Sequence, residues 1–515
     1  MKLGELLTAL ESRTDLPPDW LEREVRDIAH DSRIVQPGSL FVAVRGYHSD
    51  GHQFIPQALK RGAVAIVAEE AVEADAAGQA ALIRVPDSRS ALARLATRFY
   101  GRPSEKLTLI GITGTKGKTT TSYLVRSIIE AAGHTSGLIG TIDYRIGSRV
   151  YPAPNTTPES LELQKLLAEM VAAKAGYAVM EVSSHALALG RTEGCVFETA
   201  VFTNLQQDHL DFHKDLRSYF EAKLRLLSGL AEKAHAVVNA DDPHVQEILA
   251  NTRARAITFG MKDQADIALI GRIDHSLSGL LFSVRTPRGP VAVASPLVGK
   301  HNVYNILCAI GVGVAQGFSC NVIEQGIRNM RAVPGRMEKV DEGQSFGVVV
   351  DYAHTEESLV SLLEAVQEMA TARIITVFGC GGDRDRTKRP KMGAAAAAGS
   401  DVVIVTSDNP RSEDPLNIIL EIEAGMAASG MRVTDSDAAR TVSAERTPYY
   451  VIPDRREAVT AAIRMARRGD VVVLAGKGHE DYQIIGEKKM HFDDREIARA
   501  EIRKCGIECG VRHKG

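Results

Sequence analysis

The chain has 515 residues, of which 44% are hydrophobic and 25% charged, and its formal net charge is −3. At about 150 residues per domain, this length predicts roughly three domains, and the composition excludes a largely disordered chain. Because positive and negative residues are interspersed, we expect no nucleic-acid-binding or membrane-binding surface, and small or individually charged partners instead.

The cysteines and the amino terminus predict a cellular compartment. Six scattered cysteines are too few for a disulfide framework, which favours a reducing environment. The first residues lack an apolar core of signal-peptide length, and nowhere do about 18 apolar residues follow one another. Cys505, Cys509 and His513 lack a fourth ligand, so we expect no zinc site in this tail. These features predict a soluble, cytoplasmic protein.

Two Gly/Pro-rich turns divide the chain. The first lies at residues 101–104, and the second lies at residues 332–335 after a helix that we expect over Asn305–Arg331. We therefore predict three domains, over residues 1–104, 105–333 and 334–515, each of a normal domain size.

The second and third pieces share a pattern in which short β-rich runs end in polar residues and helical segments lie between them. In the second piece the runs are Leu107–Ile112, Ala178–Met180, Ala200–Phe202 and Ala236–Val238. In the third piece they are Val348–Val350, Ile374–Phe378, Val402–Val405 and Val471–Leu474. The pattern predicts an α/β fold with mainly parallel sheets, which bind ligands at the carboxyl ends of their strands.

Residues 111–120, Gly-Ile-Thr-Gly-Thr-Lys-Gly-Lys-Thr-Thr, follow a predicted strand and open a predicted helix that ends at Gly133. This is the setting of a phosphate-binding loop, in which glycines let backbone N–H groups approach phosphates. Lys118 would neutralise the transferring phosphoryl group, and Thr119 would hold Mg²⁺. Ile112 stands where the usual motif has its first glycine, so an ordinary strand–helix turn is the alternative. We predict nucleotide binding.

Further candidate ligands stand alone in the sequence. Glu181 and His209 follow predicted strands and would suit a divalent metal, although a helix cap and a surface histidine are the alternatives. Asn302 and Asn305 would suit a base or ribose, but an asparagine at a helix start is commonly an N-cap. Arg336 would reach phosphate from the domain boundary, and its alternative is a solvated linker residue.

Three polar loops end strands of the third piece. Asp408, Asn409 and Arg411 surround Pro410, which favours a turn; an acid, an amide and an arginine together suit a zwitterionic ligand. The alternative is a turn held by its own aspartate. Gly476 and Glu480 lie in a second loop, and Arg384 lies in a third. Three such loops at one sheet edge favour a ligand site.

This set of motifs resembles the Mur ligases, the ATP-dependent amino-acid-adding enzymes of peptidoglycan precursor synthesis, and within them the UDP-MurNAc-tripeptide synthetases. The resemblance runs from Asp31-Ser32-Arg33 to Gly478-His479-Glu480. It implies an N-terminal UDP-binding domain, a central ATPase domain and a C-terminal Rossmann-like domain that carries the amino acid. Tyr47–Ser49, Leu189 and Glu356 depart from the family's pattern, which more often has His-Gln-Ala, Gln and Pro there.

The resemblance also implies roles for individual residues. The ATP contacts would be Gly114, Thr115, Lys116, Gly117, Lys118, Thr119, Thr120, Asn302, Arg336 and Asp351. Two Mg²⁺ would be held by Thr119, Glu181, His209 and a CO₂-derived carbamate on Lys223, and the catalytic groups would be Lys118, Lys223, Glu181 and His209. The UDP-sugar peptide would meet Ser32, the Tyr47–Ser49 loop, Asn155, Thr156, Thr157, Ser183 and Arg191. The amino acid would meet Arg384, Asp408, Asn409, Pro410, Arg411, Gly476 and Glu480.

The implied reaction joins meso-diaminopimelate to the D-Glu of UDP-MurNAc-L-Ala-D-Glu through an acyl phosphate, and we expect a monomer to carry it out. Arg411 would pair with the distal carboxylate of diaminopimelate, which lysine lacks. A lysine-adding member of the family or a folylpolyglutamate synthetase is the alternative with the same fold, and the latter should lack residues 408–411 as they stand here. A regulatory or nucleic-acid-stimulated ATPase is the alternative from another class, although such proteins are usually basic.

Overall fold

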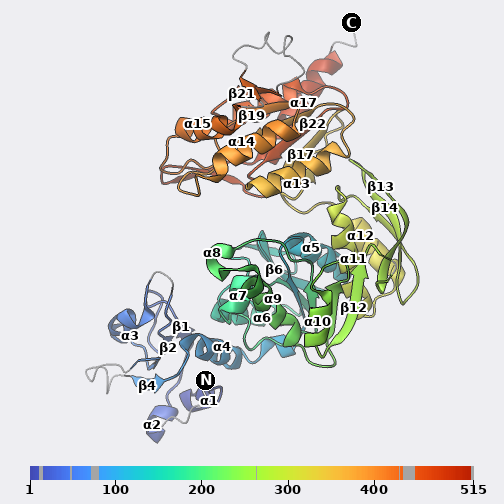
Figure 1. The fold of residues 1–515 in the computed structure, drawn as a ribbon. Helices are drawn as coiled ribbons and strands as arrows, with labels where there is room; N and C mark the ends of the chain where they lie inside the picture. Colours follow the sequence, from blue (N-terminus) through green and yellow to red (C-terminus); the bar gives the residue numbers. More distant parts are fainter. Residues whose placement is uncertain are drawn as a thin grey trace. The chain divides into compact units, whose positions relative to one another are not determined.

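The computed structural model describes residues 1–10, 16–46, 49–70, 80–262, 264–427, 430–432 and 447–511 (Figure 1). Contacts between Cα atoms divide the chain into two compact units. Unit 1 holds Met1–Ile270, Ser283–Val291 and Tyr304–Asn329, and unit 2 holds Gly271–Phe282, Ala292–Val303 and Met330–Gly515. No helix of the described residues is long and apolar enough to cross a membrane.

The first sheet of unit 1 has four parallel strands in the order β1-β2-β3-β4. Its strands are β1 (Asp27–Ala29), β2 (Ser39–Val42), β3 (Ala65–Ala68) and β4 (Ala81–Arg84). Its helices are α1 (Leu3–Leu7), α2 (Pro18–Leu21), η1 (Gly51–Phe54), α3 (Ile55–Lys60), α4 (Ser88–Phe99) and η3 (Pro103–Glu105). Leu40 and Val42 of β2 pack on the α1 and α4 side, whereas Phe41 packs on the α3 side, so the sheet is covered on both faces.

The second sheet has the order β15-β14-β13-β12-β11-β10-β5-β9-β6-β7-β8. Its strands are β5 (Thr108–Thr113), β6 (Ser136–Ile139), β7 (Asp143–Ile146), β8 (Arg149–Pro152), β9 (Tyr177–Glu181), β10 (Thr199–Phe202), β11 (His235–Asn239), β12 (Arg255–Gly260), β13 (Ile267–Ser276), β14 (Gly279–Arg285) and β15 (Val291–Ser295). The strands from β12 to β6 run parallel to one another. At the end of the sheet, β7 pairs with β6 in the antiparallel direction, and β8 pairs with β7 in the same way. The carboxyl ends of β5, β9 and β10 therefore share one edge.

Helices cover this parallel run on both faces. They are α5 (Lys118–Ala131), α6 (Ser160–Ala172), α7 (Ser184–Ala188), α8 (Leu210–His213), α9 (Leu216–Ser228), α10 (Val245–Asn251), α11 (His301–Ala315) and α12 (Cys320–Asn329). Leu163 of α6 and Phe220 of α9 pack on one face with Met180 and Phe202 of the sheet. The helix α12 packs against α5, where Gly326 lets the two backbones approach closely beside Ile128.

The helix expected over Asn305–Arg331 is wrong, because the structure has two helices there. α11 ends at Ala315 and α12 begins at Cys320. Gly317 has φ +78°, and Phe318 N donates to Gly313 O at 3.0 Å. This is a left-handed glycine cap that closes a helix, so the local backbone preference of one glycine outweighs the apolar pattern on either side.

The sheet of unit 2 has the order β16-β17-β22-β18-β19-β21-β20, parallel except for β16. Its strands are β16 (Glu338–Lys339), β17 (Gly347–Asp351), β18 (Ile374–Phe378), β19 (Val402–Val405), β20 (Gly430–Arg432), β21 (Thr447–Val451) and β22 (Val471–Ala475). A separate hairpin pairs β23 (Tyr482–Ile485) with β24 (Lys488–His491). The eight runs predicted in the two large sheets all form strands, with ends shifted by no more than one residue.

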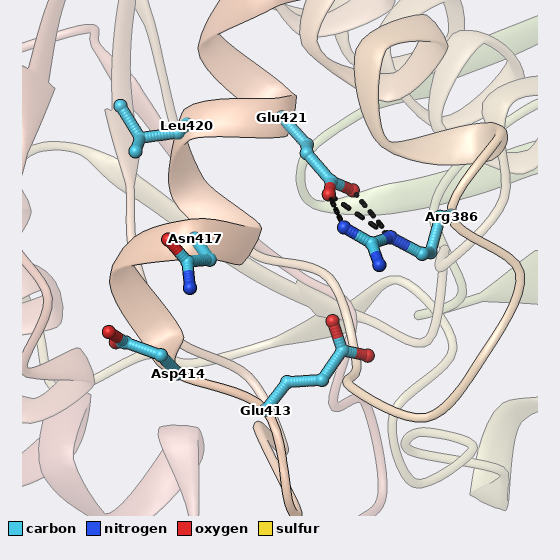
Figure 2. Close-up of a pocket in the computed structure, with 6 residues that line it drawn as sticks. All are labelled: Arg386, Glu413, Asp414, Asn417, Leu420 and Glu421. Carbon is cyan, nitrogen blue, oxygen red and sulfur yellow. Dashed lines mark hydrogen bonds and ion pairs between the residues drawn. The ribbon is translucent and has the colours of Figure 1, made fainter.

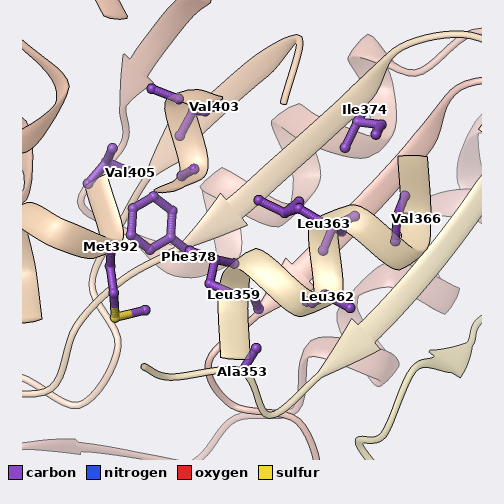
Figure 3. Close-up of a cluster of buried hydrophobic side chains, with 14 of the residues drawn as sticks. Ala353, Leu359, Leu362, Leu363, Val366, Ile374, Phe378, Met392, Val403 and Val405 are labelled. Carbon is purple, nitrogen blue, oxygen red and sulfur yellow. The ribbon is translucent and has the colours of Figure 1, made fainter. Parts of the chain in front are cut away.

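Alternate residues of the unit 2 strands pack on opposite faces. Phe378 and Val403 pack with Leu359 and Met392 beneath α13 (Glu356–Gln367), α14 (Lys388–Gly399) and α15 (Pro415–Met426) (Figure 3). Val377 packs on the other face beneath α16 (Arg455–Met465) and α17 (Asp494–Val511). This is a doubly wound α/β sheet, in which the carboxyl ends of the strands form the natural ligand edge.

Candidate active site

The loop between β5 and α5 depends on two glycines. Gly114 has φ +142° and Gly117 has φ +86°. A Cβ on Gly114 would lie 1.9 Å from Thr203 Oγ1, and a Cβ on Gly117 would lie 2.3 Å from Asn305 Oδ1. Only glycine fits either position, so the backbone can wrap tightly at the amino terminus of α5, where N–H groups and the helix dipole favour an anion.

Two lysines converge on this loop. Lys118 Nζ donates to Gly114 O and to Thr115 O, both at 2.9 Å. Lys223 Nζ, from α9, donates to the same Gly114 O at 2.8 Å. The loop carbonyls hold both amino groups at the site where a phosphate would bind.

Lys223 is 1% exposed, and its Nζ lies 4.2 Å from the centre of the Tyr219 ring. Burial, and next the charge of Lys118, hold the pKa of Lys223 well below its usual value, and Asp208 opposes them. A neutral amine is the form that reacts with CO₂, so the environment of Lys223 suits carbamate formation.

Glu181 ends β9 and is fully buried. Its Oε2 accepts hydrogen bonds from Thr119 Oγ1 and Thr141 Oγ1, both at 2.9 Å, and its Oε1 accepts one from Thr141 N at 3.0 Å. A carboxylate beside the hydroxyl of a phosphate-binding loop supplies the oxygen ligands that Mg²⁺ prefers.

His209 precedes α8 with φ +53°, and its side chain is 48% exposed. Its Nε2 lies 3.6 Å from Asp208 Oδ2, and its ring centre lies 4.9 Å from that of His185. Burial, and next the charges of His209 and His213, lower the pKa of His185 to about 4. Among the described residues, no three His, Cys, Asp or Glu side chains are grouped so that they could hold a metal ion.

Residues predicted to contact the UDP-sugar peptide lie beside Glu181. Thr157 Oγ1 donates to Glu181 O at 2.8 Å and accepts from Ser183 N at 3.0 Å. Arg191 Nη1 donates to Thr157 O at 3.0 Å, and its Nη2 pairs with Glu159 at 2.7 Å. The sheet edge thus joins this group directly to the candidate metal ligand.

Three more residues predicted to contact the UDP-sugar peptide make hydrogen bonds with other residues. Thr156 Oγ1 lies 3.1 Å from Thr141 Oγ1, which itself donates to Glu181, and Asn155 O accepts from Tyr144 OH of β7 at 2.5 Å. Ser32 Oγ donates to Gln57 Oε1 at 2.7 Å within the four-stranded sheet region. Tyr47 and His48 lie outside the described residues, as do His513 and the side chain of Cys509.

In unit 2, Asp351 ends β17 and its carboxylate accepts hydrogen bonds from Met337 N at 2.7 Å and Ala353 N at 2.8 Å. Burial raises the pKa of Asp351, and the charge of Arg336 opposes this shift. The Arg336 guanidinium lies 5.2 Å from the centre of the Tyr352 ring.

Asn302, near the start of α11, is 3% exposed and donates from Nδ2 to Val298 O at 2.7 Å. This contact joins α11 to the segment before it, and it is not an N-cap bond, in which a side-chain oxygen accepts from a backbone N–H.

The loops after β19 and β22 bring polar residues together. Asn409 Nδ2 donates to Glu480 Oε2 at 2.9 Å, and Asp408 Oδ1 lies 3.2 Å from Lys477 Nζ. Burial, and next the charge of Asp408, raise the pKa of Glu480. Gly476 has φ +109°, and a Cβ on it would lie 3.5 Å from Asp408 Oδ2. Two carboxylates and one ammonium form a buried cluster at the carboxyl edge.

Arg411 follows Pro410 with φ +52°, in the left-handed region that favours glycine. Its backbone N donates to Ile484 O at 3.1 Å, and its Nη1 donates to Gly382 O at 2.7 Å. Arg384 lies in the same Gly381–Asp385 loop and is exposed. The backbone contact with Ile484 and the side-chain contact with Gly382 together fix the direction of the Arg411 side chain.

The sequence matches three family descriptions along its length. They are the Mur ligase family catalytic domain over residues 24–100, the Mur ligase middle domain over 112–313 and the Mur ligase glutamate ligase domain over 335–478. A protein of Solibacter usitatus, named UDP-N-acetylmuramoyl-L-alanyl-D-glutamate–2,6-diaminopimelate ligase, is 47% identical over 98% of this chain and 99% of its own.

The chain belongs to the Mur ligase family.

Other Mur ligases agree in sequence and in fold. A protein of the same name from Geobacillus thermodenitrificans is 46% identical over 98% of this chain and 100% of its own. A solved structure of a diaminopimelate ligase with that name is 32% identical, with a TM-score of 0.71 over 98% of this chain and 100% of the other. A Thermotoga maritima Mur ligase solved with ADP, 20% identical with a TM-score of 0.60, shares the fold.

Two of the three departures from the Mur ligase pattern are accommodated locally. Leu189 caps α7 with its N–H bonded to His185 O. Glu356 begins α13 directly after Thr355, whose side chain caps the helix together with Ser358. A carboxylate in the first turn of a helix is favourable, so Glu356 suits the position of the usual proline.

Sequence reasoning missed three residues that shape the site: Thr141, Lys477 and Arg389. Thr141 shares Glu181 with Thr119 although it belongs to a different strand end, and no local motif marks it. Lys477 lies between Gly476 and Gly478, directly after a strand predicted to be buried. A lysine in that position was the signal that could have indicated a buried ammonium. Arg389 stands in a helix where an arginine is ordinarily solvated.

Arg389 is fully buried in α14 between two glutamates. Its Nη2 lies 2.8 Å from Glu413 Oε1, its Nη1 lies 2.9 Å from Glu421 Oε2, and its Nη2 donates to Gly381 O at 3.2 Å. A cavity of about 430 Å³ lies beside the two glutamates, lined by Arg386, Glu413, Asp414, Asn417, Leu420 and Glu421 (Figure 2). Arg389 therefore ties the loop that carries Arg384 to the loop that carries Arg411.

Replacing Arg389 by methionine should lower the free energy of unfolding by about 3 kcal/mol, because it leaves Glu413 without its cation and Glu421 with Arg386 alone. Urea unfolding measures this loss. The matched control is Arg386→Met, because Arg386 pairs with the same Glu421 from a 65% exposed position, and we expect it to cost under about 1 kcal/mol. Equal losses in the two variants would contradict the role given to the buried ion pair.

Proposed function

We propose that this Mur ligase joins meso-diaminopimelate to the D-Glu carboxylate of UDP-MurNAc-L-Ala-D-Glu with hydrolysis of ATP to ADP and phosphate. The observation that carries the proposal is that relatives named for this activity match 98% of the chain at 46–47% identity. The phosphate-binding loop beside Glu181 and the acidic cluster beside Arg411 supply the chemistry that the reaction needs.

The central part of unit 1 would bind ATP and activate the carboxylate. Gly114, Thr115, Lys116, Gly117, Thr119 and Thr120 would surround the phosphates. Lys118 would stabilise the charge that develops as the phosphoryl group moves to the carboxylate, giving an acyl phosphate. Ser32, Asn155, Thr156, Thr157, Ser183 and Arg191 would hold the UDP-sugar peptide.

The buried oxygens near Thr119 fit Mg²⁺, which would be held by Thr119, Glu181, His209 and a carbamate on Lys223. When bound, Mg²⁺ would neutralise phosphate charge and orient the transferring group. Glu181 supports this assignment best, since its buried carboxylate already lies 2.9 Å from the Thr119 hydroxyl. His209 would complete the set from its position directly before α8.

Residues of unit 2 would bind the amino acid. Arg411 would pair with the distal carboxylate of diaminopimelate, and Asp408, Glu480 and the Gly476 backbone would receive its ammonium. Arg384, Asn409 and Pro410 would complete this pocket. Asn302, Arg336 and Asp351 would contact ATP.

We also propose that the functional domains follow residues 1–104, 105–333 and 334–515. The reaction would take place in the cytoplasm, where ATP and nucleotide-activated sugars are available, and a monomer would carry it out without nucleic acid or membrane.

ADP release in the presence of ATP, Mg²⁺ and UDP-MurNAc-L-Ala-D-Glu tests the proposal. Turnover with meso-diaminopimelate, but neither with L-lysine nor without an amino acid, is the expected result. Turnover with lysine would agree with the ligase class and contradict the specificity assigned to this protein. An equal rate of ADP release with and without an amino acid would favour a regulatory ATPase.

Lys223→Arg should lower turnover by at least about 10- to 100-fold, the range for losing a group that supports a metal site. The physical reason is that an arginine cannot become a carbamate and adds a permanent charge beside Lys118. The carbamate carbon itself is observable by NMR after addition of ¹³C-bicarbonate, and its signal should vanish in the variant. The exposed Lys233→Arg is the control. An unchanged signal in Lys223→Arg would rule out this lysine as the modified group.

A further inference from the structure

Lys477 lies in the loop after β22, and its side chain is fully buried. Its Nζ donates to Tyr482 O at 2.7 Å and to Asn409 Oδ1 at 3.1 Å. The same atom lies 3.2 Å from Asp408 Oδ1 and 3.7 Å from Glu480 Oε2. Two of the three N–H groups of the ammonium therefore donate hydrogen bonds, and two carboxylates lie within ion-pair distance of it.

The ammonium of Lys477 determines which way the Asn409 amide points. Asn409 Oδ1 accepts from Lys477 Nζ and also from Ile484 N at 3.0 Å, which occupies both of its lone pairs. The Nδ2 group must then face the opposite way, where it donates to Glu480 Oε2 at 2.9 Å. Asn409 is therefore a bridge between the β19 loop and the Tyr482–Ile485 strand, with one N–H left over.

Charge in this cluster is not balanced by Lys477 alone. Asp408 and Glu480 contribute two carboxylates, and Lys477 contributes one ammonium. Asp408 Oδ1 is buried, and it accepts no hydrogen bond within the described part of the chain. One further ammonium placed beside Asp408 would satisfy that oxygen and bring the cluster to neutrality, which is the favourable state for buried charges.

We propose that Lys477 is a positioning and specificity residue for the amino acid substrate. It holds Asp408, Asn409 and Glu480 in the arrangement that accepts one substrate ammonium next to the carboxylate site of Arg411. The inference rests on the proposed function, and it goes further by assigning the preference for a second ammonium to a residue that does not itself touch the substrate.

The test compares meso-diaminopimelate with L-2-aminopimelate, which lacks the distal amino group, in the full-length chain. We expect Lys477→Met to lower the ratio of their kcat/KM values by about tenfold or more, through a higher KM for diaminopimelate, since tenfold corresponds to loss of a single well-placed polar contact. The KM for ATP should change by less than about twofold. Lys488→Met, an exposed lysine of the adjoining hairpin, is the control and should leave the ratio unchanged.

Methionine leaves two buried carboxylates without a cation, so Lys477→Gln is measured in parallel because its amide can still donate to Tyr482 O. Thermal unfolding reports whether each variant folds. If both variants lose activity toward the two amino acids in equal proportion, Lys477 only stabilises the fold and the inference is overturned. If the unaltered protein shows no turnover with diaminopimelate, the proposed function fails instead, which is a different result.

Discussion

Lys118→Ala should reduce ATP-dependent ligation by about 10³-fold or more, because we propose Lys118 as the cation that stabilises the charge on the transferring phosphoryl group. Its Nζ donates to Gly114 O and Thr115 O, both in the loop itself, and alanine removes these two contacts together with the charge. ADP release under saturating substrates measures the effect.

The fold should survive this change, since the α5 helix keeps its glycine start and its buried face. Lys165→Ala on the exposed side of α6 is the matched control and should retain full turnover. A Lys118→Ala protein that folds normally and has the turnover rate of the unaltered protein would contradict the assignment of residues 114–120 as a phosphate-binding loop.

Arg411→Ala should lower kcat/KM for meso-diaminopimelate by about 10³- to 10⁴-fold, approaching the discrimination seen when a polar site loses its partner. An arginine pairs with a carboxylate through two parallel N–H groups, and Gly382 O orients the Arg411 guanidinium for such a contact. Steady-state kinetics with varied amino acid measures the loss, and the KM for ATP should stay within about twofold.

Two variants sharpen this prediction. Arg411→Lys keeps the charge but not the forked geometry, so it should recover only a small part of the lost rate. Arg468→Ala, at an exposed position in the same unit, should match the unaltered protein. Full activity in Arg411→Ala with diaminopimelate would show that another group binds the distal carboxylate.

The fold was predictable where local signals agree with packing. The runs at 374–378 and 402–405 become β18 and β19 without any change of limits, because continuous apolar runs bounded by turns suit strands buried on both faces. The helix expected over Asn305–Arg331 fails for the opposite reason. Its apolar pattern continues across Gly317, while the left-handed backbone of that glycine ends α11.

The site was predictable in the same uneven way. Gly114 to Thr120 form one contiguous motif, so spacing alone predicts a phosphate-binding loop. Glu181 looked like a possible helix cap, yet it is the buried acceptor for Thr119, which lies 62 residues away in the chain. His209 was predicted to join Glu181 at a metal site, and this role stays a prediction, as do the other roles assigned to the site residues.

The sequence by itself determined the α/β class, the phosphate-binding loop and the resemblance to the Mur ligases, since each depends on residues close together in the chain. Only the tertiary structure decided the surroundings of Lys223, whose contact with Gly114 spans 109 residues, and those of Lys477, whose contact with Asn409 spans 68. Burial and neighbouring charge set the chemistry of a lysine, and distant segments supply both when the chain folds.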